Sequence, residues 1–313
     1  MVHHAVGTAT SLQIFPGQPI ASATNLITGR LLTPERTMPE SSTIKWAGQK
    51  RAFTMKVFSF KFMRPAALFC LMATLFALST HQKMVSRSWH QPLDVVIYPI
   101  NADSSPATQR YINSLRDSDF AEIDQWMSRE AKRHNLGIET PLLTRLGPTV
   151  NSMPPPLPAQ PDTLKSMLWS LQLRFWVFRN TPDNDSNLRR IRVFVAYQTG
   201  ENDTPLAHSV GLQKGLIGVV HAFSHPGQTR QNNIVIAHEI LHTVGAIDKY
   251  SITGAPVYPH GFTNPHSKPL YPQRFAEIMA GSIAISPNQS QMADSLRSTR
   301  INTTTAREIA WIE

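Results

Sequence analysis

Two histidines four residues apart are the part of the sequence with the clearest capacity for chemistry. His238 and His242 lie in the apolar run NIVIAHEILHTV, residues 233–244, whose pattern predicts a helix. Residues four apart lie on one face of a helix, so both imidazoles can bind one Zn²⁺ at about 2.0 to 2.1 Å. The spacing therefore predicts a metal site with His238 and His242 as ligands.

Two acidic residues and a glycine complete the pattern that a hydrolytic zinc site requires. Glu239 follows the first histidine, so its carboxylate can accept a proton from a zinc-activated water and return it to a leaving amine. A catalytic zinc ion usually has three protein ligands plus water, and Asp248 is the expected third ligand. Gly245 can adopt the left-handed conformation that ends a helix, which would turn the chain back and bring Asp248 to the metal.

The extended motif resembles that of a known clan of zinc peptidases. The string HEILHTVGAIDKY, residues 238–250, resembles the zinc motif of the metzincins, in the variant where aspartate replaces the usual third histidine. That variant occurs in the snapalysin-type small neutral proteases, which also have a tyrosine where Tyr250 stands here. The segment EIMAG, residues 277–281, resembles the metzincin turn with the invariant methionine, and TAREIAW, residues 305–311, resembles the snapalysin closing helix. The resemblance covers about residues 230–313.

The resemblance implies a fold, an activity and a class of substrate. The implied fold is an α+β, zincin/metzincin-like domain with a mixed β-sheet, a long active-site helix and a Met-turn beneath the zinc. The implied activity is that of a zinc metalloendopeptidase acting on a peptide or protein substrate, with Glu239 as general base. In such folds an edge strand pairs with extended substrate through backbone hydrogen bonds, and residues 216–223 are the candidate strand. The segment between Asp248 and Met279 is longer than in the small proteases, so substrate preference is not carried over.

Other side chains compete for the place of the third ligand. A carboxylate from Glu277 would make a glutamate-type zincin, but Glu277 lies two residues before Met279, where the metzincin turn is expected. His260 and His266 lie in the inserted loop and could also approach the metal, although a solvated loop position is more common. His221 and His225 lie by a strand end near the active-site helix and could contact the substrate or the metal ligands, although a core or rim position is more common. We therefore favour Asp248 as the third ligand.

The segments around the motif predict the elements that position it. Four runs rich in β-branched and aromatic residues are expected as strands: residues 94–100, 142–146, 191–197 and 216–223. A short helix is expected around residues 305–312. Together with the helices upstream, this order predicts an α+β domain with a mixed sheet and two or three long helices.

Two helices are expected upstream of the motif, each with an apolar face. The first is capped by Ser118, ends near Gly137 and has apolar residues at helical spacing: Phe120, Ile123, Met127 and Ala131. The second is capped by Asp162 and has its own apolar series: Leu164, Leu168, Leu171, Phe175 and Phe178. We expect both series to face the core.

An apolar segment near the N-terminus predicts an association with a membrane. The run PAALFCLMATLFALS, residues 65–79, has the apolar centre of a signal sequence, and with residues 57–62 it is long enough to span a bilayer. Six Lys/Arg residues precede it and two follow closely, so the positive-inside rule places the C-terminal part outside the cytoplasm. Cleavage after Ser79 would release a secreted product, and a buried core helix is the alternative interpretation.

This segment divides the chain into three parts. We expect a disordered or mis-assigned start over residues 1–54, a signal-anchor or transmembrane segment over residues 55–80, and the metallopeptidase domain over residues 91–313. The expected protein is therefore a single-pass membrane protein with an extracytoplasmic catalytic domain, which would be periplasmic in a Gram-negative cell.

Charge and cysteine content argue against two classes of function, nucleic acid binding and cysteine-based catalysis. The net charge is +9, but residues 1–64 hold eight Lys/Arg and two Asp/Glu, so the remainder carries only about +3 and no nucleic acid partner is expected. The only cysteine, Cys70, lies in the apolar segment, which excludes an intrachain disulfide and argues against cysteine-based catalysis. The alternative to a peptidase is a non-catalytic envelope protein in which a metal only holds the fold.

Overall fold

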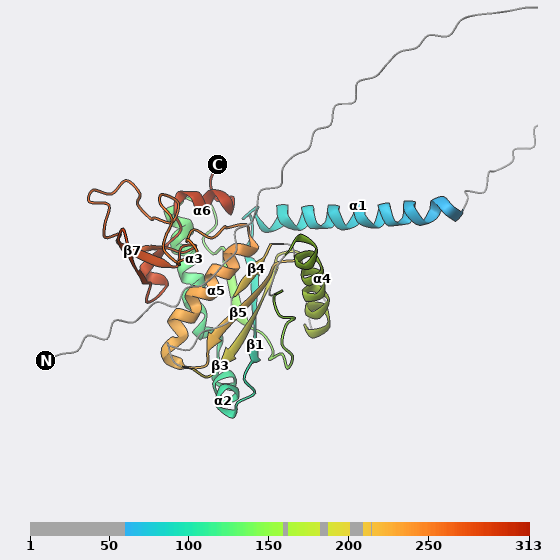
Figure 1. The fold of residues 1–313 in the computed structure, drawn as a ribbon, viewed down its shortest axis with the longest axis horizontal. Coiled ribbons are helices and arrows are strands. Elements are labelled where there is room, and N and C mark those ends of the chain that lie inside the picture. Colours follow the sequence, from blue (N-terminus) through green and yellow to red (C-terminus); the bar gives the residue numbers. More distant parts are fainter. Residues whose placement is uncertain (1–59, 159–161, 182–186, 201–208, 214) are drawn as a thin grey trace, which may run out of the picture. The chain divides into compact units, whose positions relative to one another are not determined.

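The structure is a computed structural model that describes residues 60–158, 162–181, 187–200, 209–213 and 215–313. The chain divides into two units: one covers residues 15–74 and the other includes residues 75–313. The boundary in the sequence falls inside the N-terminal helix α1 (Phe60–Ser86). The expectation for residues 1–54 lies outside the described residues. The larger unit has the α+β composition that the sequence predicts, because its helices pack on a mixed sheet (Figure 1).

A five-stranded sheet forms the centre of the larger unit, with the strand order β2-β1-β3-β5-β4. Four of its strands run parallel, and they are the four that the sequence predicts: β1 (Leu93–Asn101), β2 (Leu142–Leu146), β3 (Arg190–Gln198) and β5 (Ile217–Phe223). The fifth strand, β4 (Val210–Leu212), pairs antiparallel with β5 and is an edge of the sheet. The expectation of a mixed sheet is therefore confirmed.

Both faces of the sheet are buried, which explains the nearly continuous apolar sequence of its central strands. Successive side chains of a strand point to opposite faces. In β1, Val95 and Ile97 belong to one apolar core, whereas Val96 and Tyr98 belong to a second core on the other face. The sheet therefore requires helices on both sides.

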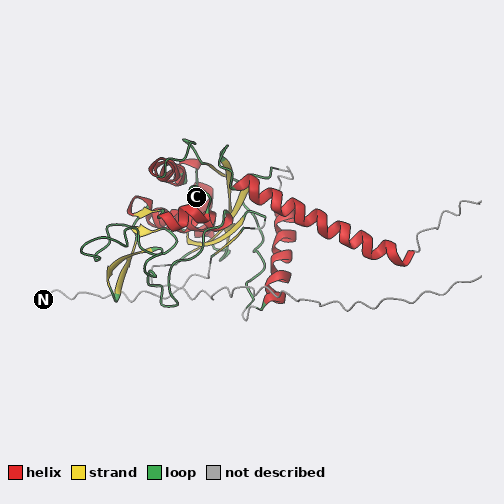
Figure 2. Cartoon of the chain, turned by 90° about the horizontal axis from the view of Figure 1, so that it is seen from above, coloured by secondary structure: helices red, strands yellow, loops and turns green. Residues whose placement is uncertain are grey.

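Three helices cover the face that Val95 and Ile97 share, and one helix covers the opposite face (Figures 1 and 2). The first group is α2 (Pro106–Ser114), α3 (Ala121–Arg133) and α5 (Thr229–Thr243). The helix on the other face is α4 (Thr163–Asn180), and α6 (Thr303–Glu308) closes the described part of the chain. The expected apolar face of α3 is confirmed, since Ile123, Met127 and Ala131 are fully buried. The expected cap, Ser118, is wrong, because α3 begins at Ala121 and no side chain caps it.

The prediction of which face of α4 packs in the core is wrong. The helix is capped as predicted, because the Asp162 side chain accepts a hydrogen bond from the Lys165 backbone N–H. However, the residues that face the sheet are Trp169, Leu173 and Val177. The five residues expected in the core are all exposed by more than half of their surface: Leu164, Leu168, Leu171, Phe175 and Phe178. Helix α4 has two apolar faces, and the sheet covers only one of them.

Residues 246–313 consist mainly of loops and short strands (Figure 2). Four short strands pair in two small sheets: β6 (Ala276–Glu277) with β9 (Thr299–Arg300), and β7 (Ser282–Ser286) with β8 (Gln289–Met292). None of these strands, nor α2 and β4, is apparent from the periodicity of the sequence. Their short lengths give no detectable pattern.

Helix α1 has the length and composition of a membrane-crossing segment. Among the described residues it is the one helix with these properties, over Arg64–Ser86 with a mean hydropathy of 1.2. None of its most apolar 18-residue stretch is buried in the structure, which argues against a core helix. A signal sequence has the same length and composition, so both the anchored and the cleaved form stay predictions.

Candidate metal centre

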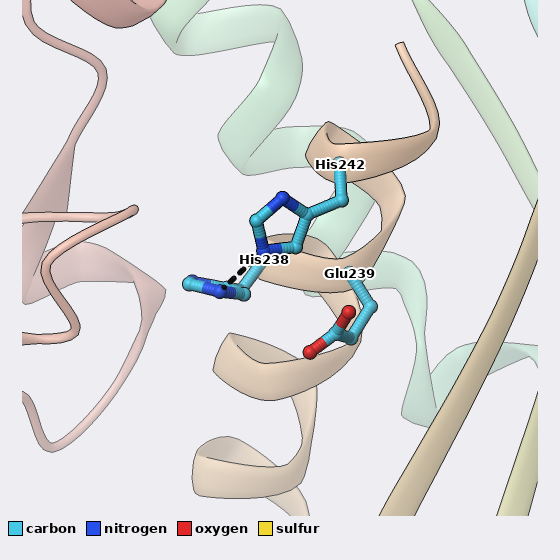
Figure 3. A group of neighbouring side chains, drawn as sticks. All are labelled: His238, Glu239 and His242. Carbon is cyan, nitrogen blue, oxygen red and sulfur yellow. Dashed lines mark hydrogen bonds between the residues drawn. The ribbon is translucent and has the colours of Figure 1, made fainter. Parts of the chain in front are cut away.

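Helix α5 presents two imidazole rings from one face, as its sequence predicts (Figure 3). The opposite side of the helix is held in the core by residues such as Ile236, Ile240 and Leu241. His238 and His242 lie one turn apart, with ring centroids separated by 4.7 Å and ring planes at 80°. Their Nε2 atoms face each other at 3.0 Å.

Asp248 lies against both imidazoles. Its Oδ1 atom is 3.0 Å from His238 Nε2 and 3.1 Å from His242 Nε2. The structure thus brings together the three side chains that the sequence proposes as ligands, in a triangle of two nitrogens and one oxygen. All three side chains are mostly buried, so a ligand at this point has little contact with bulk water.

A glycine-dependent turn brings Asp248 back to the helix. The helix ends where the Ala246 N–H donates to the Leu241 carbonyl at 3.0 Å, while Gly245 has a φ of 113°. This left-handed conformation is the one expected for Gly245, and residues with a Cβ adopt it at a cost. The turn is therefore encoded by the glycine in the motif.

Backbone carbonyls fix the orientation of both rings. His238 Nδ1 lies 3.0 Å from the Ile278 carbonyl oxygen, and His242 Nδ1 lies 2.8 Å from the Ala246 carbonyl oxygen. A carbonyl can only accept a hydrogen bond, so Nδ1 carries the proton in each ring and Nε2 is left to face Asp248. Such outer contacts orient the histidine ligands of metal sites.

Three hydrogen-bond acceptors therefore meet at one point. A neutral imidazole with a protonated Nδ1 presents a lone pair at Nε2, and a carboxylate oxygen is also an acceptor. Such atoms at 3.0 to 3.1 Å are stable together only with a proton or a cation among them. Two imidazole nitrogens and a carboxylate oxygen suit zinc, and at these separations each can lie about 2.0 to 2.2 Å from one ion. The residues fit a zinc ion.

Protonation competes with a metal for the same atoms. Burial acts to lower the pKa of His238, but the hydrogen bond to Asp248 and the charges of Glu239 and Asp248 outweigh it and raise the pKa to about 9. Burial acts to raise the pKa of Asp248, yet hydrogen bonds from both histidines hold that pKa well below its ordinary value. At neutral pH, Asp248 is therefore ionised and His238 holds a proton that a metal ion must displace.

Glu239 lies on the same helix with its carboxylate toward the histidines (Figure 3). One ligand-capable atom each from His238, Glu239 and His242 lies within 4.8 Å of the others. The side chain is buried, and its Oε2 atom has no hydrogen-bond partner. Burial raises the pKa of Glu239, while the charges of the two histidines lower it. A buried carboxylate oxygen without a partner is suited to accept a proton from a bound molecule.

Tyr250 lies near His238. Its ring centroid is 6.4 Å from that of His238. Burial, followed by the negative charges of Asp248 and Glu239, raises the pKa of the Tyr250 hydroxyl. The hydroxyl is therefore protonated at neutral pH and is available as a hydrogen-bond donor near the three acceptors.

Glu277, the competing ligand, uses its carboxylate elsewhere. Its Oε2 accepts the backbone N–H groups of Met279 at 2.7 Å and Ala280 at 3.1 Å, and its Oε1 accepts from the Thr305 hydroxyl at 2.6 Å. The side chain is fully buried, which raises its pKa to about 7. Glu277 thus shapes the turn around Met279, whose neighbour Ile278 accepts the His238 hydrogen bond.

The remaining candidate histidines lie outside this group. His260 Nδ1 contacts the Thr304 hydroxyl at 3.2 Å, and His225 Nδ1 accepts the Gly227 N–H at 3.0 Å. His266 is exposed in a loop, and His221 lies within strand β5. Over the ranges that the structure describes, the grouping of ligand-capable side chains contains only residues of α5, with Asp248 beside them.

The edge strand beside α5 is not the one that was expected. Residues 217–223 form β5, which lies between β3 and β4 and is not an edge strand at residues 217–219. The edge is β4, whose Gly211 approaches α5 so closely that a Cβ there would lie 2.4 Å from His242 Cβ and 2.5 Å from the Glu239 carbonyl oxygen.

The C-terminal helix α6 stabilises the loop that carries Asp248. Glu308 Oε2 accepts the Ile247 N–H at 3.0 Å and the Lys249 ammonium at 2.6 Å, so it contacts both neighbours of Asp248. The Glu308 carbonyl also accepts a hydrogen bond from Arg87. The position of one candidate ligand thus depends on a residue far along the chain.

No known protein family matches this chain, and curated protein sequences give no significant match.

Proposed function

We propose that this chain is a zinc metallopeptidase similar to the metzincins. The observation that carries the proposal is the convergence of His238 Nε2, His242 Nε2 and Asp248 Oδ1 within 3.1 Å of one another, with Nδ1 of each ring turned toward a backbone carbonyl. The buried Glu239 carboxylate lies beside them. This arrangement supports hydrolysis at a metal rather than electron transfer or simple cation storage.

The chain's own residues have distinct parts in the proposed reaction. His238, His242 and Asp248 would hold the zinc ion, which when bound lowers the pKa of water and polarises a substrate carbonyl. Glu239 takes the proton from the attacking water and returns it to the leaving amine. The protonated Tyr250 hydroxyl donates to the oxygen on which negative charge develops.

The proposed substrate is a peptide bound in an extended conformation. Strand β4 is an edge of the described sheet and lies directly against α5. A substrate that pairs with an edge strand binds through its backbone, so many sequences are accepted. We propose that β4, in place of the strand expected from the sequence, has this role.

The proposed location is the extracytoplasmic side of a membrane, with α1 as the anchor. None of the most apolar stretch of α1 is buried, and more basic residues precede it than follow it. Removal of the segment after Ser79 would instead give a secreted enzyme.

Substitution of Glu239 by Gln tests the proposed activity. Gln keeps the size of the side chain but cannot accept a proton, so we expect the full-length variant to bind one zinc ion per chain and to lose at least about 100-fold in peptide hydrolysis. Zinc is measured by atomic emission and cleavage with a peptide library. Retained activity would contradict the mechanism.

The alternative, a non-catalytic protein with a structural metal, predicts a different pattern. It predicts stoichiometric zinc, no hydrolysis by the wild type, and unfolding on removal of the metal with a chelator. Zinc content near zero in the wild type would contradict both functions.

A further inference from the structure

Helix α4 presents a large apolar face to solvent. Six side chains of this face, called here the outer α4 face, are between 51% and 66% exposed: Leu164, Met167, Leu168, Leu171, Phe175 and Phe178. Their spacing of three and four residues places them along one side of the helix. No described helix or strand of residues 87–313 lies over them (Figures 1 and 2).

This face is not needed for packing within the domain. Trp169, Leu173 and Val177 already fill the contact between α4 and the sheet. Large apolar side chains that lie together on an exposed surface commonly mark a binding site. The outer α4 face is therefore a candidate binding surface.

The charge of α4 indicates what kind of partner it is. Residues 163–180 contain three basic residues, Lys165, Arg174 and Arg179, and no Asp or Glu. The nearest acidic group is the capping residue Asp162, whose carboxylate lies 3.3 Å from the Lys165 ammonium, and the Nε atom of Arg174 is buried. The Arg179 guanidinium lies 5.8 Å from the centre of the Phe175 ring, at the margin of the outer face. Large apolar residues bordered by basic ones are typical of helices that lie in the surface of an anionic bilayer.

The connection to α1 keeps the domain close to a bilayer. Only residues 87–92 separate the end of α1 from strand β1, and a segment of that length spans at most about 20 Å. Trp89 also holds this connection to the domain, since its Nε1 donates to the Ile309 carbonyl at 2.7 Å. A tethered surface meets lipid at a high effective concentration, so even a modest affinity gives docking.

We propose that the outer α4 face docks onto the anionic lipid surface of the membrane in which α1 is anchored. The docked domain would have a fixed orientation, with α4 inserted to the depth of the lipid headgroups. This inference rests on the proposed membrane location, but it concerns a second and separate contact with lipid.

A fluorescent probe on the full-length chain tests the docking. In a Cys70→Ser background, Leu168→Cys carries a nitrobenzoxadiazole probe on the outer α4 face, and Asn288→Cys carries it on the exposed turn between β7 and β8 as a matched control. The protein is reconstituted into vesicles of phosphatidylcholine with or without phosphatidylglycerol. Spin labels near the lipid headgroups should quench the Leu168→Cys probe several-fold more than the control, and more in the anionic vesicles.

The basic border of the face is tested in the same system. Lys165→Glu combined with Arg179→Glu should reduce the quenching of the Leu168→Cys probe several-fold in anionic vesicles and have little effect in neutral ones. Equal quenching of both probes would overturn the proposal. A blue-shifted Leu168→Cys probe that is not quenched by lipid and depends on protein concentration would also overturn it, in favour of a second copy of the chain.

The native cysteine separates failure of docking from failure of the membrane location. Probe-labelled Cys70 in the wild type reports whether α1 enters the bilayer, through quenching by spin labels deep in the acyl chains. Quenching at Cys70 without quenching at Leu168→Cys overturns the docking alone. Absence of quenching at Cys70 overturns the membrane anchor, and the docking proposal with it.

Discussion

At the scale of single residues, His238 links metal binding to pH. Its pKa is raised from 6.5 to about 9, so in the metal-free protein it is protonated below that pH. Zinc displaces this proton, and the apparent affinity for zinc should therefore fall by about tenfold for each pH unit below about 9. Competition with a chromophoric chelator measures the affinity.

Replacement of Asp248 supplies the control for this pH dependence. Asp248→Asn keeps the shape of the side chain but removes the charge that raises the pKa of His238. We expect weaker zinc binding overall and a pH dependence displaced toward the ordinary histidine range. An affinity that does not change between pH 6.5 and pH 9 in the wild type would contradict the proposed competition.

Glu277 is a second residue with an altered pKa, and it makes a separate prediction. Burial raises its pKa from 4.5 to about 7, so the folded state holds this proton more tightly than the unfolded state does. The free energy of unfolding should therefore fall as the pH rises from about 4.5 to about 7, and stay lower above that range. The shift corresponds to a loss of roughly 3 kcal/mol.

Glu277→Gln should remove this part of the pH dependence. The amide can accept from the two backbone N–H groups and donate to the Thr305 hydroxyl, while it carries no charge at any pH. Thermal unfolding of the two proteins in detergent across that pH range measures the difference. The variant should still bind zinc, and loss of zinc would instead support Glu277 as the third ligand.

The sequence predicts the residues that meet at the centre better than it predicts their surroundings. The i, i+4 spacing is sufficient to place two imidazoles on one helical face. The carbonyl of Ile278, which orients His238, lies 40 residues away in the chain. Every residue has a backbone carbonyl, so the sequence does not reveal which carbonyl accepts the hydrogen bond from His238.

At the scale of elements, the contact between β4 and α5 depends on the absence of a side chain. Gly211→Ala would place a Cβ 2.4 Å from His242 Cβ, so strand and helix must separate. We expect a destabilisation of about 1 to 3 kcal/mol and weaker zinc binding, because His242 moves with the helix. Denaturant unfolding and zinc titration measure the two effects.

Gly137→Ala is the matched control for this substitution. A Cβ at Gly137 meets no heavy atom within 4 Å, so this variant should unfold at the same denaturant concentration as the wild type. If Gly211→Ala and Gly137→Ala were equally stable and bound zinc equally well, the close contact between β4 and α5 would be ruled out.

Helix α4 shows where periodicity alone fails to predict packing. Both of its faces carry large apolar residues at helical spacing, so the sequence predicts a helix without deciding which face is buried. The residues expected in the core are those spaced along the helix from Leu164. The residues that contact the sheet are instead those spaced from Trp169. By contrast, α3 has one apolar face, and that face is buried as predicted.

At the scale of the whole molecule, the composition of the fold was predictable and its arrangement was not. Four strands and the long helices follow from local patterns of residues. The strand order depends on contacts between distant segments, as in the pairing of β1 with β3 across about a hundred residues. Local patterns contain no information on such pairings, so they do not distinguish the inner strand β5 from the edge strand β4.

Glu308 has a consequence for the order of events during synthesis. Its carboxylate holds Ile247 across a separation of 61 residues. During synthesis, α5 with its two histidines therefore leaves the ribosome before Glu308, which holds the loop that carries Asp248, has been made. An ion bound in that interval meets two histidines on one helix, but His238 still lacks its contact with the Ile278 carbonyl, and the loop that carries Asp248 is not yet held by Glu308.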